Sequence, residues 1–320
     1  MTTKTDMTRA DTAKLFLKGM AMGAADVVPG VSGGTVAFIS GIYERLINAL
    51  KSINIAAIRI LFKDGIGAAW SAIDGTFLLV LFAGIMTSIL SLAKLISYWL
   101  TNHPVLVWSF FFGLILASVI YIVRQMKQPS ISHVTGFLVG VAFAYWITVA
   151  EPLAIDPTHS NIFFAGMIAI CAMILPGISG SFILLLMGLY THVIGAIKQL
   201  DIITLAIFAS GCMIGLLSFS RVLSWLLTKY HDLTLAVLAG VMLGSLNKVW
   251  PWKQTLSYRT NSHGEQVPFM QDNVLPAQYE YLVGADSMML YAIGLMLVGF
   301  LVVLGLEGVN VFKNKTADSL

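Results

Sequence analysis

Charged residues are scarce in this sequence. Only 11% of its 320 residues are charged, whereas 58% are apolar and the mean hydropathy is +0.84. Ordinary soluble domains carry about 25% charged residues. We therefore predict an all-α polytopic membrane protein, with residues 1–320 forming a single membrane domain and the lipid bilayer as its surroundings. The formal net charge of +3 is spread thinly along the chain, so the sequence has no basic surface typical of nucleic-acid binding.

Cysteine is also scarce, and the usual catalytic motifs are missing. Cys171 and Cys212 each lie in an apolar run, without the CxxC or Cys/His spacing of a metal or redox site, so we interpret both as packing residues. The sequence contains no HExxH, no P-loop and no cluster of His and Asp residues. We expect no metal, no cofactor and no enzymatic activity.

Long apolar runs, in contrast, are abundant. At about 20 residues for each crossing of a bilayer, six runs are long enough to span it. These runs cover residues 75–100, 105–123, 134–150, 202–227, 233–249 and 286–306. Two further apolar regions, 14–50 and 161–197, are interrupted by Pro-Gly and should contain broken helices.

The two interrupted regions are copies of one unit. "PGVSGGTVAFISGIYERLINAL" from Pro29 aligns without gaps with "PGISGSFILLLMGLYTHVIGAI" from Pro176, and the similarity continues into the spans that follow. We predict two repeats, 12–150 and 158–310, each with a broken re-entrant helical segment and three transmembrane helices. The first repeat is longer because it contains the basic segment Lys51 to Asp74.

The number of spans between the copies predicts their relative orientation. Three spans separate the two broken segments, so the second copy should be inverted if each broken segment enters and leaves by the same face. Inverted repeats with broken helices are typical of secondary transporters, whose site lies between the repeats at the middle of the membrane. Twelve basic residues fall on the side of both termini, and only Lys198, Lys248, Lys253 and Arg259 fall on the other. The positive-inside rule therefore places both termini in the cytoplasm.

The helix breaks are the first candidate site. Each Pro-Gly step, Pro29-Gly30 and Pro176-Gly177, should end one helix, and the next helix then begins with free N–H groups and a positive dipole end. Small residues at these starts allow an oxyanion to approach the backbone. They are Ser32, Gly33, Gly34 and Thr35 in the first copy, and Ser179, Gly180 and Ser181 in the second. The alternative is that each motif is only a tight turn with small residues for helix packing.

Two cations occupy the same position of the two repeats. Lys94 and Arg221 each lie inside an apolar span, within two turns of its end, where a charge is costly and by default indicates function. We expect both to contribute to substrate binding. The alternative is that their long side chains reach the membrane interface and only anchor the helix.

Acidic residues near a break occur only in the first repeat. Asp26, Glu44 and Arg45 could provide a coupling-ion site or an ion pair, whereas the second copy has Met173 and Thr191-His192 at these positions. An equally supported alternative is that Glu44 and Arg45 cap a half-helix at the interface.

The sequence resembles a known family at "KGMAMGAADVVPGVSGGTVAFISGIYERLINAL" and "ILPGISGSFILLLMGLY". Over about residues 12–310 it is similar to the bacterial and archaeal polyprenyl-phosphate transporters, formerly a family of unknown function. The resemblance implies transport of undecaprenyl phosphate, the lipid carrier of cell-wall precursors, from the outer to the inner leaflet of the bacterial cytoplasmic membrane.

The residues and the resemblance together predict a lipid-phosphate flippase. Its phosphate would be held between the two half-helix ends and the two cations, and one repeat would rock against the other. Two alternatives remain open at this stage: a transporter or channel for small anions, and a membrane enzyme that acts on prenyl phosphates. The sequence leaves open the coupling ion, the tail length, the net direction of transport and whether the chain forms a homo-oligomer.

Overall fold

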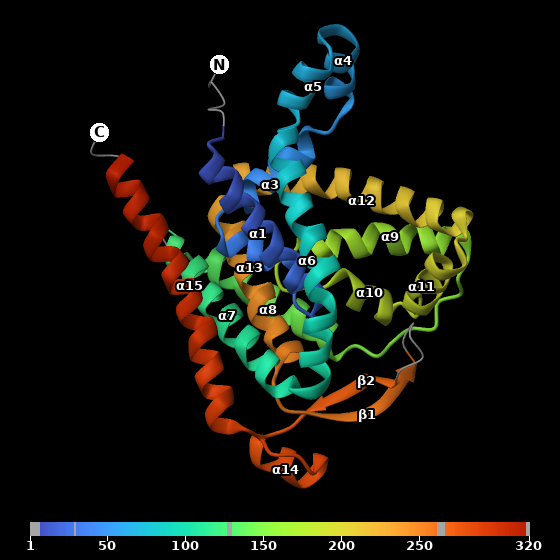
Figure 1. The fold of residues 1–320 in the computed structure, drawn as a ribbon, viewed down its shortest axis with the longest axis vertical. Helices are drawn as coiled ribbons and strands as arrows, with labels where there is room; N and C mark the ends of the chain where they lie inside the picture. Colours follow the sequence, from blue (N-terminus) through green and yellow to red (C-terminus); the bar gives the residue numbers. More distant parts are fainter. Residues whose placement is uncertain (1–6, 29, 127–129, 261–265, 318–320) are drawn as a thin grey trace.

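The structure is a computed structural model that describes residues 7–28, 30–126, 130–260 and 266–317. It is predominantly helical (Figure 1). The first half of the chain contains α1 (Arg9–Val27), α2 (Gly33–Ile39), α3 (Tyr43–Ser52), α4 (Ile55–Asp64), α5 (Ile66–Ala72), α6 (Gly75–Asn102), α7 (Pro104–Gln125) and α8 (Ile131–Val149).

The second half begins with the same order of elements. It contains α9 (His159–Ile174), α10 (Gly180–Leu186), α11 (Tyr190–Gln199), α12 (Ile202–Lys229), α13 (His231–Ser245), the 3-10 helix η1 (Leu246–Val249), the strands β1 (Lys253–Thr260) and β2 (Gln266–Asn273), α14 (Pro276–Val283) and α15 (Met289–Ala317). In each half, three helices separated by short breaks come first; in the first half α4 and α5 follow them before the long apolar helices begin.

The long apolar helices make this a polytopic membrane protein. Within the described residues, α6, α7, α8, α12 and the continuous segment His231–Val249 are long and apolar enough to cross a bilayer. The bent pair α10 and α11 raises that number to six if it is counted as one span. The last predicted span corresponds to α15, whose described apolar part, Met289–Gly305, is shorter than the other five. Large apolar side chains on the outer surface, such as Leu90 (79% exposed) and Ile131 (87% exposed), are suited to contact with lipid.

The helices pack in four pairs. α1 lies along α6 and α9 lies along α12, whereas α7 packs against α15 and α8 against α13 (Figure 1). Gly84 of α6 and Gly211 of α12 occupy the same position of the two sequence repeats. A methyl group on Gly84 would collide with the carbonyl of Phe16 in α1, and one on Gly211 with the carbonyl of Phe163 in α9. Small residues that allow close backbone approach are the usual packing device of membrane helices.

Two segments outside the spans are more ordered than the sequence indicated. The basic segment Lys51 to Asp74 forms α4 and α5, which project from the body at the top of Figure 1. The connection between the predicted spans 233–249 and 286–306 contains the antiparallel pair β1 and β2, in which Lys253 lies opposite Asn273, and the short helix α14. These elements are too short and too polar to produce an apolar run, so the search for spans did not identify them.

Candidate functional site: the paired helix breaks

The first break separates α1 from α2. Gly30 has a φ of 84°, a left-handed conformation that favours glycine. Beyond it, the Asp26 carboxylate accepts a hydrogen bond from the Gly33 amide at 2.7 Å, and the Ser32 hydroxyl accepts one from the Gly34 amide at 3.1 Å. The first amides of α2 are therefore satisfied by oxygens of the chain itself, one of them charged. Pro29, the other predicted breaking residue, lies outside the described residues.

The second break separates α9 from α10 and has a different polar environment. Gly177 repeats the left-handed conformation with a φ of 91°. Met173 stands at the position of Asp26, and Ser179 makes no side-chain cap to α10. The Ser179 hydroxyl lies instead 2.9 Å from that of Ser181. The Asp26 carboxylate therefore occupies the start of α2, whereas no carboxylate within the described residues occupies the start of α10.

The two breaks lie against each other, as the sequence predicts. The buried Ser32 hydroxyl donates to the Met173 carbonyl at 2.9 Å. The Gly177 amide donates to the Thr35 hydroxyl at 3.0 Å, and the Tyr43 hydroxyl donates to the Ile174 carbonyl at 3.2 Å. These bonds satisfy backbone groups that the second break leaves without helical partners, which is a requirement for irregular backbone in a membrane.

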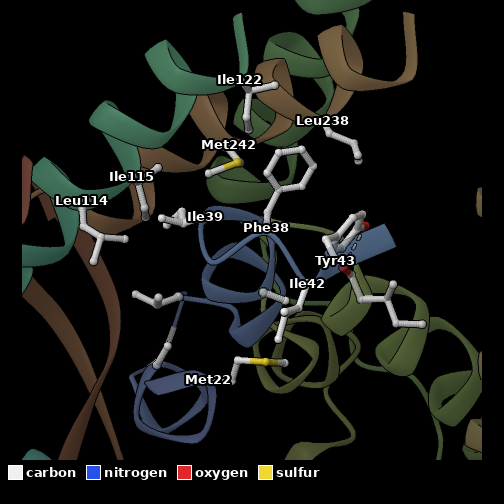
Figure 2. Close-up of a cluster of buried hydrophobic side chains, with 14 of the residues drawn as sticks. Met22, Phe38, Ile39, Ile42, Tyr43, Leu114, Ile115, Ile122, Leu238 and Met242 are labelled. Carbon is white, nitrogen blue, oxygen red and sulfur yellow. Dashed lines mark hydrogen bonds between the residues drawn. The ribbon is translucent and has the colours of Figure 1, made fainter. Parts of the chain in front are cut away.

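The first broken segment is fixed in the main hydrophobic core. Figure 2 shows side chains of α2 and α3 packed among those of α7 and α13. The labelled residues from the broken segment are Phe38, Ile39, Ile42 and Tyr43, and those from the long helices are Leu114, Ile115, Ile122, Leu238 and Met242.

Each broken segment also contains a second bend that the sequence analysis did not predict. Gly41, between α2 and α3, has a φ of 71°, and Gly188, between α10 and α11, has a φ of 74°. The bend between α10 and α11 is 110°. The two glycines align in the repeat, so their shared position was the signal that could have revealed the second bend.

The matched cations lie on the outer surface of their helices. Lys94 is an exposed residue of α6. Arg221, also exposed, donates to the carbonyl of Leu217 at 2.7 Å and to that of Ile53 at 3.3 Å. No recorded hydrogen bond or ion pair within the described residues joins either cation to a helix break. Their role in substrate binding stays a prediction.

Glu44 and Arg45 have separate partners. Arg45 forms a two-pronged ion pair with Asp74, at 2.8 Å from Nε and 3.2 Å from Nη2, and its guanidinium lies 4.4 Å from the centroid of the Phe77 ring. Glu44 lies 3.0 Å from Nε2 of His231. These contacts link α3 to the starts of α6 and α13, which agrees with the interfacial alternative. The coupling role of Asp26, Glu44 and Arg45 stays a prediction.

Both breaks meet the end of α13 at a small cavity. Gly30 and Gly177 line it from the two breaks, and Ser179, Thr148, Ser245 and Lys248 add polar groups. Its volume of about 10 Å³ is close to the minimum for one water molecule. Lys248 was not among the predicted site residues, although it falls within the predicted span 233–249. A charge within an apolar span, the signal that indicated Lys94, is present at Lys248 as well.

This arrangement defines a class of protein. A polytopic helical membrane protein in which two broken helical segments meet has the build of a secondary transporter. The chain belongs to the VCA0040-like, undecaprenyl phosphate translocase-like family, whose model matches residues 22–267.

Two relatives are named "Polyprenyl-phosphate transporter". The one from Vibrio cholerae is 55% identical over 292 residues, which cover 91% of this chain and 95% of the relative. The one from Staphylococcus aureus is 33% identical over 265 residues, which cover 74% of this chain and 85% of the relative. No solved structure matches the chain.

Proposed function

We propose that this protein is a flippase that moves polyprenyl phosphate, with undecaprenyl phosphate as its substrate, across the bacterial cytoplasmic membrane by alternating access. The observation that carries the proposal is the contact between the two breaks, where Ser32 and Thr35 bond the backbone of the second broken segment. A family of undecaprenyl phosphate translocases and two relatives named for polyprenyl-phosphate transport support this substrate. Transport of a lipid across a bilayer breaks no covalent bond, so we propose no enzymatic step.

The packing of the long helices supports an inverted pair of repeats, 12–150 and 158–310. α7 and α13 occupy corresponding positions, as do α8 and α15, and each packs against the partner from the other repeat. We propose that these four helices form a frame across both repeats. The two broken segments, with α6 and α12, then rock against that frame. This motion changes the face of the membrane from which the breaks are accessible.

In this arrangement the matched cations act at opposite faces. The Arg221 contact with Ile53 places Arg221 beside the basic segment that follows α3, on the side that we propose is cytoplasmic with both termini. Lys94, in the inverted position, then lies toward the outer face. We propose that each exposed cation receives the phosphate head group from the lipid and passes it toward the breaks. Ser179, Gly180 and Ser181 are open to an anion, whereas Ser32, Gly33, Gly34 and Thr35 could take part only after the Asp26 carboxylate leaves the Gly33 amide.

An assay of leaflet-selective transport tests this function directly. The purified chain is reconstituted into proteoliposomes with labelled polyprenyl phosphate or with the labelled, uncharged polyprenol. Quenching of the label in the outer leaflet then measures how fast each lipid crosses the bilayer. We expect protein-dependent transport of the phosphate and at least about tenfold slower transport of the alcohol, because charge-assisted hydrogen bonds are roughly twice as strong as neutral ones. Equal rates for both lipids would contradict head-group recognition, and release of inorganic phosphate would reveal an enzyme instead.

A further inference from the structure

Two lysines, the half-buried Lys248 and the buried Lys253, lie near the breaks and away from the cations predicted from the sequence. Lys253, the first residue of β1, is 8% exposed, and its ammonium lies 4.2 Å from the centroid of the Trp108 ring. It donates to the Lys248 carbonyl at 2.5 Å. The Lys248 ammonium lies 4.4 Å from the centroid of the Phe182 ring in α10.

Neither lysine has an acidic partner in the described part of the chain. The recorded ion pairs there join Arg45 to Asp74, and His231 to Glu44 and Asp232. Burial and the neighbouring charge of Lys248 lower the pKa of Lys253 well below its ordinary value. A buried amine without an anionic partner therefore tends to lose its proton. A bound anion would stabilise the protonated form of the lysine.

The Lys248 side chain lies at the point where both breaks converge. A methyl group on Gly30 would lie 2.8 Å from Cγ of Lys248, and one on Gly177 would lie 2.8 Å from the Ser245 hydroxyl. The same cavity receives the Ser179 hydroxyl and, from α8, that of Thr148. One cation and several hydroxyl groups therefore line a cavity between the two segments that we propose to move.

We propose that Lys248 binds the phosphate monoester head group of the prenyl lipid, together with the Ser179 hydroxyl. Lys253 positions Lys248 by donating a hydrogen bond to the Lys248 backbone carbonyl. The proposal deepens the flippase function and rests on it. A cavity of about 10 Å³ is too small for a phosphate, so the proposal requires the cavity to widen before the head group binds. Separation of the breaks would open the cavity to the head group.

Binding to the purified full-length chain tests this site. The probes are farnesyl phosphate, farnesol and inorganic phosphate, and the readouts are the dissociation constant and the melting temperature. The variants are Lys248→Met, Lys248→Arg and Lys253→Met, with Lys198→Met at the exposed end of α11 as the matched control.

We expect Lys248→Met to bind farnesyl phosphate about ten- to a hundredfold more weakly, the range for loss of a hydrogen bond to a charged group. Without ligand, its melting temperature should stay the same or rise, because an apolar side chain replaces a half-buried amine that has no acidic partner in the described residues. Lys248→Arg should retain most of the binding, and Lys198→Met should bind like the unmodified chain. Lys253→Met should weaken binding less than Lys248→Met.

A structural role would produce the opposite pattern. Unchanged affinity in Lys248→Met, a lower melting temperature with unchanged affinity, or failure of this variant to fold would each overturn the proposal. If inorganic phosphate binds as tightly as farnesyl phosphate, the lipid is not the ligand. If the Lys248→Met variant flips polyprenyl phosphate at the full rate, the proposed binding site is wrong but the proposed flippase function is unaffected. If the unmodified chain flips no polyprenyl phosphate, the proposed function itself is wrong.

Discussion

Gly34→Ala is expected to reduce transport at least about tenfold, which corresponds to about 1.4 kcal/mol in an activation barrier. A methyl group at this position would lie 2.7 Å from the Ile174 carbonyl oxygen and 3.2 Å from that of Met173. Both atoms belong to the backbone of the second broken segment and cannot rotate away, so the two breaks must separate. The carrier would then be kept from the state with the breaks in contact, which alternating access also requires. Overpacking of this kind costs about 1–3 kcal/mol of folding stability.

The matched control is Gly67→Ala in α5. No atom lies within 4 Å of a methyl group there, and alanine favours a helix over glycine by about 1 kcal/mol. The two substitutions are chemically the same, yet they should change the melting temperature in opposite directions. A Gly34→Ala chain with unmodified stability and transport would show that the breaks tolerate separation and that their contact does not carry the function.

The Lys94→Leu, Arg221→Leu double variant is expected to lose transport almost to the protein-free rate. Each cation, in our proposal, receives the head group at one face, and alternating access requires both faces. The folded protein should remain close to normal abundance, because both side chains are exposed and the Arg221 contacts are surface hydrogen bonds to two carbonyls.

Lys198→Leu is the control for the double variant, since it removes an exposed cation at the end of α11. The measurement is leaflet-selective quenching with equal amounts of each reconstituted protein. Transport by the double variant at the unmodified rate would remove Lys94 and Arg221 from the pathway and leave them as interfacial anchors.

The sequence predicts the meeting of the breaks because two kinds of information agree there. Pro-Gly steps at matched positions locate the interruptions, and a gapless repeat implies that both copies have the same shape. Gly30 and Gly177 accordingly share a left-handed conformation, and the repeat extends to the helix contacts at Gly84 and Gly211.

The polar partners of the breaks could not be predicted in the same way. The Asp26 bond to Gly33 depends on how sharply the chain reverses between α1 and α2, a detail that the repeat cannot supply because the second copy has Met173. Lys248 lies at the end of the predicted span 233–249 and was counted on the side opposite the termini, yet the packing of η1 turns it toward Phe182 and the breaks. Side-chain direction at the end of a span is set by such packing and not by the apolar pattern.

The position of the phosphate is the most direct test of the account. It can be read from a structure of the purified chain bound to polyprenyl phosphate in a lipid nanodisc. We expect the phosphate beside the Lys248 ammonium and the Ser179 hydroxyl, with the breaks further apart than the 2.9 Å bond from Ser32 to Met173 now allows. A phosphate bound elsewhere, with the Ser32 and Thr35 bonds between the breaks intact, would contradict the account.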